Sequence, residues 1–330
     1  MRGPPSERSP ADLLAFGVVN LDKPPGPSAH QVAGWVREFT ADALADAGAD
    51  TSVDRVAHAG TLDPKVTGSL PMLLGAGARL ARLFDDTTKE YIAVLELHGP
   101  APSDFEQVVS AFEGELYQRP PRKSAVRRRR RVREVYDLDV LEREQRRALL
   151  RVRCESGTYI RKLCHDLGLA LGTGAHMGAL RRIGTGGFDD TDLVCMETFV
   201  DALAFWVEED DPDPLRAVVD PAERVLVGLP RVTIAPSAAR QVAEGAPVYA
   251  PGVLAVHPPR ADAPGASVSA DRANTDTSED DDGETAGTVS PDGQLVACYT
   301  PDSAAVCLGR LVGDPSADAG TVVDLERVLV

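Results

Sequence analysis

Residues 58–83 read HAGTLDPKVTGSLPMLLGAGARLARL, and this stretch decides how the rest of the chain is interpreted. At its centre Asp63 precedes Pro64, which fixes its own φ and keeps the residue before it out of the helical region. With Gly60 before it and Gly68 after it, Asp63 is predicted to sit on a stiff loop, which suits a nucleophile or base. The same residues also fit an ordinary Asp-Pro turn that Asp63 only caps, and the stretch alone does not choose between these interpretations.

Upstream of this loop, the sequence predicts a strand, a rigid turn and a helix. Phe16–Leu21 is a short apolar run that leads into a proline-rich turn over residues 22–28. Ser28 is placed to cap the helix that follows. The Ala/Asp-rich residues 41–54 are expected to be peripheral, and the polar residues 1–12 are expected to form a loose arm.

Downstream of the loop, the periodicity alternates between helix and strand. Residues 76–83 suit a helix, and Lys89–His98 shows the two-residue alternation of a strand. Tyr91 falls at the start of this strand, near a surface or cleft, although a core tyrosine would give the same pattern. A helix is expected over Ser103–Gly114.

The middle of the chain continues in the same way. Strands are expected over Val135–Glu142 and Leu149–Cys154, followed by a helix over Tyr159–Leu171 that Thr158 is placed to cap. The helix carries an apolar stripe at positions i, i+3, i+4, i+7 and i+11. Arg161, in its first turn, lies beside that stripe.

Cysteine and histidine spacing gives no support for a metal site. The five cysteines form no C-x-x-C pair, so neither a zinc cage nor a disulfide framework is indicated. Cys164, His165 and His176 have metal-binding side chains, but their spacing matches no zinc pattern, and structural roles are expected for them.

The charge balance is unusual for a chain of 330 residues, a length that suggests two domains. The net charge is −16, and only five of the 35 basic residues are lysine. Such an acidic, lysine-poor composition resembles that of proteins from salt-loving organisms, in which salt screens the self-repulsion. The acidity therefore does not argue against a nucleic-acid partner.

One segment reverses this charge. Nine of the 15 residues in Arg119–Arg133 are basic and none is acidic. A dense positive block in an acidic chain predicts a polyanion contact, and neutralising its arginines should weaken that contact and flatten its salt dependence. A solvated basic loop without a partner is the alternative.

The last third of the chain predicts a separate, strand-rich unit. Residues 194–229 are expected to be mostly helical, and a new unit begins at Arg231. Residues 258–292 carry nine acidic residues and almost no large apolar ones, so they should be disordered. Strands are then expected over three segments, Gln294–Tyr299, Ala305–Leu311 and Thr321–Val330. The chain has no apolar run of membrane-spanning length and no signal-peptide pattern, so a cytoplasmic location without membrane contact is expected.

Several of these segments resemble the motifs of one enzyme family. His58–Gly68 (HAGTLDPKVTG) is similar to the catalytic motif of TruB-type pseudouridine synthases, and Val19–Ser28 (VNLDKPPGPS) is similar to their first motif. Gly157–Leu163 (GTYIRKL) and Ala175–Arg182 (AHMGALRR) resemble their third. Tyr117–Tyr136 and the trailing unit resemble the archaeal dyskerin-like branch most, which is the catalytic subunit of H/ACA guide-RNA particles. Long motifs in the right order make a chance match improbable.

The resemblance implies a fold and a domain organisation. The fold class is α+β, with a pseudouridine synthase catalytic domain built on a mixed, largely antiparallel central sheet and a small β-barrel-like PUA domain. The expected division is a flexible N-terminal arm at 1–15, the catalytic domain at 16–230 and the RNA-binding PUA domain at 231–330. The disordered acidic insert at about 258–292 is expected to leave the PUA core intact.

The resemblance also assigns the catalytic residues. Asp63 matches the catalytic aspartate, the nucleophile. Tyr91 matches the tyrosine that packs on the target base and helps to move its proton. Arg161 matches the arginine that pairs with the aspartate. Nothing is oxidised and no group is carried when uridine becomes pseudouridine, so neither a cofactor nor a metal is expected.

Other residues are implied in the substrate pocket and in RNA contact. Leu180 matches the leucine that closes the pocket, and His58 matches the histidine near the flipped nucleotide. Lys23 lies in the first motif, which braces the active-site loop. Four arginines of the basic block complete the RNA-contact set: Arg127, Arg128, Arg129 and Arg130.

The function implied is isomerisation of specific uridines in RNA, most simply in rRNA within an H/ACA particle. The partners would then be an H/ACA guide RNA, rRNA and the small accessory proteins of that particle. A stand-alone synthase acting on the T-loop uridine of tRNA would use the same catalytic residues, so the active site does not decide between the two. A third alternative, a non-catalytic RNA-binding scaffold, disagrees with the intact set of Asp63, Tyr91 and Arg161.

Overall fold

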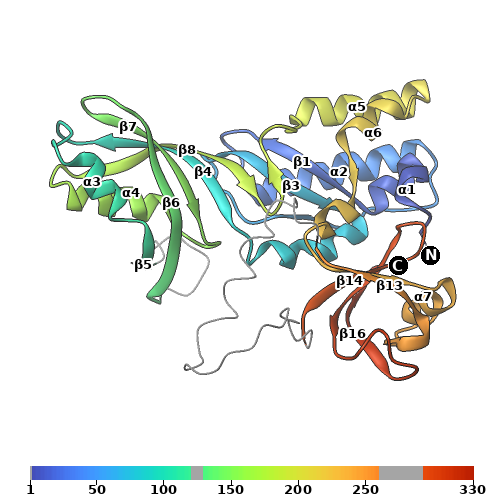
Figure 1. The fold of residues 1–330 in the computed structure, drawn as a ribbon. Coiled ribbons are helices and arrows are strands. Elements are labelled where there is room, and N and C mark those ends of the chain that lie inside the picture. Colours follow the sequence, from blue (N-terminus) through green and yellow to red (C-terminus); the bar gives the residue numbers. More distant parts are fainter. Residues whose placement is uncertain (1, 120–128, 260–292) are drawn as a thin grey trace, which may run out of the picture.

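The computed structural model describes residues 2–119, 129–259 and 293–330. Over these residues the chain forms a ten-stranded sheet and a six-stranded sheet, with helices packed against both (Figure 1). The helices are α1 (Pro10–Ala15), α2 (Ala29–Asp46), α3 (Phe105–Ser110), α4 (Ile160–Ala170), α5 (Met196–Glu209), α6 (Asp213–Val218) and α7 (Pro236–Ala243), with short 3₁₀ helices η1 (Pro5–Glu7), η2 (Gly75–Phe84), η3 (Ala222–Leu226) and η4 (Ala250–Gly252). In the described residues, no helix combines the length and apolar character needed to cross a membrane.

The larger sheet has the strand order β10-β1-β3-β8-β4-β7-β6-β5, with β2 paired to β3 and β9 to β8. Its strands are β1 (Gly17–Lys23), β2 (Val56–His58), β3 (Thr67–Leu74), β4 (Lys89–Leu97), β5 (Gly114–Gln118), β6 (Arg131–Arg143), β7 (Arg147–Cys154), β8 (Ala175–Thr185), β9 (Phe188–Asp189) and β10 (Asp220–Pro221). The pair β3–β8 is parallel and the other pairs are antiparallel. The prediction of a mixed, largely antiparallel central sheet is confirmed.

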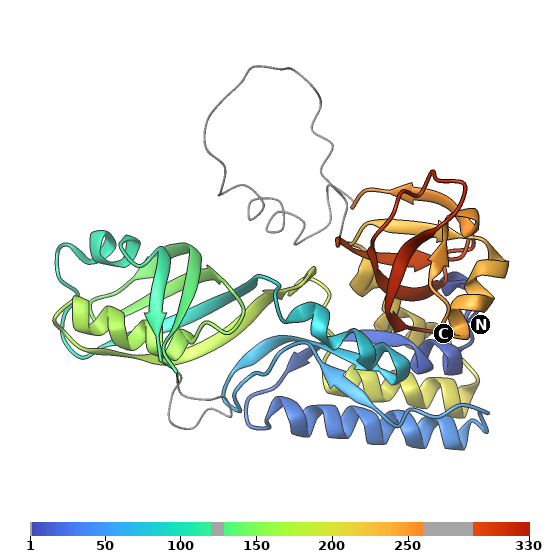
Figure 2. The ribbon, with the colours of Figure 1, turned by 90° about the horizontal axis from the view of Figure 1, so that it is seen from below.

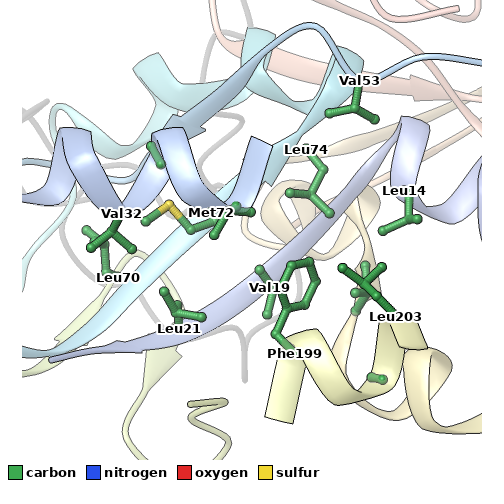
Figure 3. Close-up of a cluster of buried hydrophobic side chains, with 14 of the residues drawn as sticks. Leu14, Val19, Leu21, Val32, Val53, Leu70, Met72, Leu74, Phe199 and Leu203 are labelled. Carbon is green, nitrogen blue, oxygen red and sulfur yellow. The ribbon is translucent and has the colours of Figure 1, made fainter. Parts of the chain in front are cut away.

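Two apolar cores cover the two ends of this sheet. At one end, α2 and α5 pack on β1 and β3 through fully buried side chains such as Val19, Met72 and Phe199 (Figure 3). At the other end, α3 and α4 pack on β4, β6 and β7. Each fully buried side chain of this kind contributes roughly 1.5–3 kcal/mol. Tyr91 and Leu180 are packed against both cores, so they lie at the junction between them.

The smaller sheet has the order β12-β16-β15-β14-β11-β13 and packs on α7. Its strands are β11 (Arg231–Ile234), β12 (Val248–Tyr249), β13 (Val253–His257), β14 (Leu295–Tyr299), β15 (Ala305–Leu311) and β16 (Thr321–Val328). The three late strands confirm the sequence prediction. In both views this sheet lies beside the α1 and η3 end of the molecule, near the two termini (Figure 2).

The N-terminal segment corrects the prediction of a loose arm. Arg8 is 2% exposed and forms a two-pronged ion pair with Glu223 of η3, at 2.8 and 2.6 Å. The same carboxylate accepts the Ala305 N–H of β15 at 3.0 Å. Leu13 and Leu14 of α1 are buried in the first core. The arm is therefore fixed by partners about 200 residues away, which local composition cannot indicate.

Several local predictions are confirmed and others are corrected. Ser28 caps α2 in a reciprocal capping box with Gln31. Residues 76–83 form a 3₁₀ rather than an α-helix, and residues 41–54 are not wholly peripheral, since α2 continues to Asp46 and buries Leu44. Thr158 does not cap α4, because its hydroxyl bonds the carbonyl of Glu155 instead.

The helix expected over Ser103–Gly114 is shorter, because the chain turns into β5 at Gly114. The predicted disordered insert lies almost wholly outside the described residues, as does most of the basic block.

Candidate active site

Asp63 lies on the loop that joins β2 to β3, and main-chain bonds hold this loop on both sides of it. The Val66 N–H bonds the Asp63 carbonyl at 2.9 Å, which closes a turn. The Pro64 carbonyl accepts the Gly26 N–H at 2.8 Å, so the turn after β1 packs on the loop. The stiffness predicted from the Asp-Pro dipeptide is thus reinforced by contacts with the first motif.

Lys23 is the strongest of these braces. Its side chain is fully buried, and its ammonium donates to the carbonyls of Pro64 and Val66 at 3.0 and 2.9 Å, and to that of Pro24 at 2.9 Å. Burial lowers the pKa of Lys23 from its ordinary value. With its donors occupied in this way, Lys23 acts on the site through the loop and does not line the pocket.

The Asp63 carboxylate forms an ion pair with the guanidinium of Arg161, in the first turn of α4. Asp63 comes from the loop before β3, and Arg161 comes from α4, which packs on β8, the neighbour of β3 in the larger sheet. Both remain about half exposed, at 53% for Asp63 and 48% for Arg161. The carboxylate is therefore paired with a cation and is still open to a ligand.

A cavity of about 340 Å³ lies beside this ion pair. Lys65 and Val66 of the Asp63 loop line one part of its wall, and Arg161 lines another. The β8 segment from His176 to Leu180 completes the lining. The structure thus places Leu180, predicted to close the pocket, in the same cavity wall as the arginine that holds Asp63.

Tyr91 lies in the sheet next to β8 and bonds a residue that the sequence analysis missed. Its side chain is hydrogen-bonded to Arg182. Burial raises the pKa of Tyr91 to about 12, and the guanidinium of Arg182 opposes that rise. The phenol therefore keeps its proton at neutral pH and faces a cation.

Arg182 is 1% exposed and connects three parts of the site. Besides bonding Tyr91, it donates from Nε to the Ser69 carbonyl at 2.8 Å and from Nη2 to the Gly60 carbonyl at 3.4 Å. Gly60 and Ser69 flank the Asp63 loop. A signal for Arg182 existed in the sequence, because strand alternation places it on the same side of β8 as Leu180.

Gly68 shows how closely the elements approach here. Its φ is +97°, and an added Cβ would lie 2.1 Å from the Arg182 carbonyl. Gly68 pairs with Arg182 in the parallel β3–β8 contact. A side chain at this position would force β8, and with it Leu180 and Arg182, away from the Asp63 loop.

A third buried basic side chain, after Lys23 and Arg182, lies close to the same loop. Lys89, at the start of β4, is 4% exposed and donates to the Phe84 carbonyl and the Thr87 hydroxyl, both at 2.7 Å. Burial, and then the charge of Arg182, lowers the pKa of Lys89 to about 7. Its side chain comes within 3.8 Å of where a Cβ on Gly60 would lie.

His58 ends β2, just before the loop. Its Nδ1 is buried and has no hydrogen-bond partner among the described residues. Burial, and then the charge of Arg182, lowers the pKa of His58, so the imidazole is neutral at pH 7.

The predicted RNA-contact arginines are only partly described. Arg129 and Arg130 are exposed and lead into β6, whereas Arg127 and Arg128 lie outside the described residues. Among the described residues, no group of three or more His, Cys, Asp or Glu side chains is placed to hold a metal ion.

Comparison with protein families gives matches along the catalytic part of the chain. The model of the TruB family pseudouridylate synthase N-terminal domain matches residues 49–104 and 99–160. The model of the tRNA pseudouridylate synthase B C-terminal domain matches residues 161–227, and that of the DKCLD domain matches residues 3–33.

Similar proteins cover the full chain. A probable tRNA pseudouridine synthase B of Haloarcula marismortui is 56% identical over 332 residues, which cover 100% of this chain and 94% of the relative. A protein of the same name from Methanopyrus kandleri is 40% identical, covering 99% and 86%.

Two solved structures are also similar. A chain of a Cbf5-Nop10-Gar1 complex is 37% identical, with a TM-score of 0.80 and coverage of 100% and 89%. A chain of an H/ACA RNP bound to a substrate RNA containing 2′-deoxyuridine is 36% identical, with a TM-score of 0.79 and coverage of 99% and 89%.

Proposed function

The chain belongs to the TruB family and is an RNA pseudouridine synthase, and we propose that it modifies rRNA as the catalytic subunit of an H/ACA guide-RNA particle. The observation that carries the catalytic part of this proposal is the ion pair of Asp63 and Arg161 at the wall of a cavity that Leu180 also lines. The observation that carries the guide-dependent part is the similarity, over the whole chain, to a chain of a Cbf5-Nop10-Gar1 complex.

The reaction breaks the N1–C1′ bond of uridine and forms a bond from C1′ to C5 of the same base. The proton on C5 is then lost and N1 gains one, so atoms and electrons balance without a redox partner. The uridine must leave its stack to enter the cavity, and an extruded base requires an apolar or aromatic wall to receive it. Leu180, in the cavity lining, would supply that wall, and Tyr91 packs with it at the junction of the two cores.

Asp63 is the group that adds covalently to the nucleoside or assists its cleavage. Arg161 keeps the carboxylate ionised and aims it, because an opposite charge within bonding distance favours the charged form. Entry of a uridine would exclude water from the half-exposed pair and strengthen the interaction. Attack at the sugar and attack at the base are both compatible with this geometry.

Tyr91 supports the base and helps to transfer its proton, with Arg182 holding the phenol oxygen. His58, which ends β2 just before the Asp63 loop, would lie near the flipped nucleotide. Lys23 keeps the Asp63 loop in place. No step in this scheme uses a cofactor.

The smaller sheet fits the role of the RNA-binding PUA domain, which would hold the guide RNA. It begins at Arg231, where the sequence predicts a new unit, and β13 and β14 lie on either side of the acidic insert. The catalytic domain at 16–230 would hold the target uridine. Small accessory proteins complete the particle, as in the complexes to which the chain is similar.

Reconstitution tests this function. The full chain, the accessory proteins and a guide RNA are combined with an rRNA fragment, and pseudouridine is mapped at each uridine. We expect modification at the guided position alone, and none when the guide is omitted or its pairing sequence is scrambled. Guide-independent modification of the T-loop uridine in a tRNA transcript, with no guided activity, would support the alternative that the names of the curated relatives favour.

A further inference from the structure

A second cavity, of about 470 Å³, adjoins the one assigned to the target uridine. The two cavities share Arg161, His176 and Met177 in their walls. The rest of the second lining comes from Arg119, Lys162, His165 and Ala175. Nothing in the catalytic scheme above uses this second space.

The charge of the second cavity favours an anion. Arg161 and Lys162 each pair with one carboxylate, but Arg119 and His165 form no ion pair with another described residue. The cavity also lies at the N-terminal half of α4, which has no acidic residue in its first turn. The positive end of the helix dipole therefore adds to the side-chain charges.

The remaining lining favours a flat apolar group beside that anion. Met177, the buried Ala175 and the ring of His176 offer an apolar face. The His176 ring is held in place, because its Nδ1 lies 3.0 Å from Nε2 of His98. A ring held in this way is a suitable surface for stacking a base.

The cationic side of the cavity is also fixed by the backbone. Gln118, which is 2% exposed, accepts the Tyr159 N–H at 2.8 Å and donates to the Tyr159 carbonyl at 3.3 Å. These two bonds tie the end of β5 to the start of α4. Arg119 follows Gln118 directly, and it lines the same cavity as Lys162 of α4.

We propose that the second cavity is a subsite for the RNA nucleotide directly next to the target uridine. Its phosphodiester would lie among Arg119, Lys162 and His165, and its base would lie against His176 and Met177. Two cavities that share a wall match two consecutive nucleotides of one strand. The inference rests on the proposed function, since it takes the first cavity as the uridine pocket.

The test removes the negative charge of one phosphodiester of the target RNA, on either side of the target uridine. Target RNAs carry a neutral methylphosphonate in place of the phosphodiester 5′ or 3′ to the target uridine, and their affinity for the guide-loaded complex is measured. We expect one of the two replacements to weaken binding roughly tenfold, the loss that follows when a charged hydrogen bond is removed. Lys162→Gln and His165→Ala should each weaken binding of the unmodified RNA.

A double-substitution cycle decides the assignment. In Lys162→Gln, the sensitive methylphosphonate should weaken binding by clearly less than tenfold, because one of the three groups that would meet the phosphodiester no longer carries a charge. Arg143→Gln is the matched control: Arg143 is also exposed and ion-paired, with Glu106, and it lines neither cavity. In that variant the full tenfold effect should remain.

Two results would overturn the subsite. One is a wild-type complex that binds both methylphosphonate RNAs as tightly as the unmodified one. The other is a double-substitution cycle in which Lys162→Gln and the methylphosphonate each weaken binding by the same factor alone and together, so that their effects on the dissociation constant multiply. Failure of the proposed function would give a different result: the wild-type complex would form no pseudouridine in the RNA that carries no methylphosphonate.

Discussion

The cations of this site occupy two contrasting environments. Lys23, Lys89 and Arg182 are at most 4% exposed, and the donors of all three bond main-chain carbonyls or hydroxyl groups. Arg161 is half exposed and pairs with the Asp63 carboxylate. The buried cations hold the loop and the strands in register, whereas the exposed one pairs with the carboxylate that we propose as the reacting group. The difference separates residues that build the site from residues that meet the substrate.

The largest effect should come from the exposed pair. Arg161→Ala should lower the single-turnover rate on a cognate RNA by roughly 10²–10³-fold, because Asp63 loses the cation that orients it and favours its ionised form. Arg161→Lys should recover part of the rate. An unchanged rate and an unchanged pH profile would remove Arg161 from the mechanism.

Among the buried cations, Lys23 should matter most for stability. Lys23→Met leaves the carbonyls of Pro64 and Val66 without the donor they have in the native loop, so the free energy of unfolding should fall by about 3 kcal/mol. Urea denaturation measures this change. Lys65→Met, at an exposed lysine of the same loop, is the control and should change stability by less than about 0.5 kcal/mol. Equal effects would contradict the bracing role.

Arg182 should act on the rate through Tyr91. Arg182→Lys should slow the single-turnover reaction roughly tenfold while RNA affinity stays within about twofold, because the substituted residue touches no RNA in this account. In a Tyr91→Phe background, Arg182→Lys should slow the single-turnover reaction little further. Arg181→Lys is the control, at a neighbour that is ion-paired to Asp22. Fully multiplicative effects of the Arg182 and Tyr91 changes would exclude this coupling.

The last effect concerns Lys89 and the pH dependence of stability. Its pKa is about 7 in the folded protein against an ordinary 10.5, so between these values the unfolded chain binds a proton that the folded chain lacks. The contribution of Lys89 to the free energy of unfolding therefore rises with pH across that interval. The melting temperature of the wild type should increase relative to that of Lys89→Met as the pH is raised from 7 to 10. A constant difference would show that Lys89 ionises normally.

The exposed pair of Asp63 and Arg161 could be predicted from the sequence, whereas much of the buried set of cations could not. The Asp-Pro dipeptide and the flanking glycines indicate a stiff carboxylate, and the apolar stripe of α4 fixes which side Arg161 takes, because these signals are local. The burial of Arg182 depends on Gly60, Ser69 and Tyr91, which come from three separate segments.

Other failures of prediction have similar causes. The N-terminal arm looks disordered until Glu223 provides a buried partner for Arg8. The 3₁₀ form of η2 shares its apolar pattern with an α-helix, so the sequence does not distinguish the two. The signal that was available and not used is the alternation along β8, which puts Arg182 on the Leu180 side.

The central claim is that Asp63 performs the chemistry and does not contribute to RNA binding. The measurement that tests it most directly compares Asp63→Asn with the wild type on one cognate RNA, by single-turnover pseudouridine formation and by equilibrium binding. The account predicts at least a roughly 10³-fold loss of rate with affinity unchanged within about threefold. An Asp63→Asn protein that turns over at the wild-type rate, or that fails to bind RNA, would contradict it.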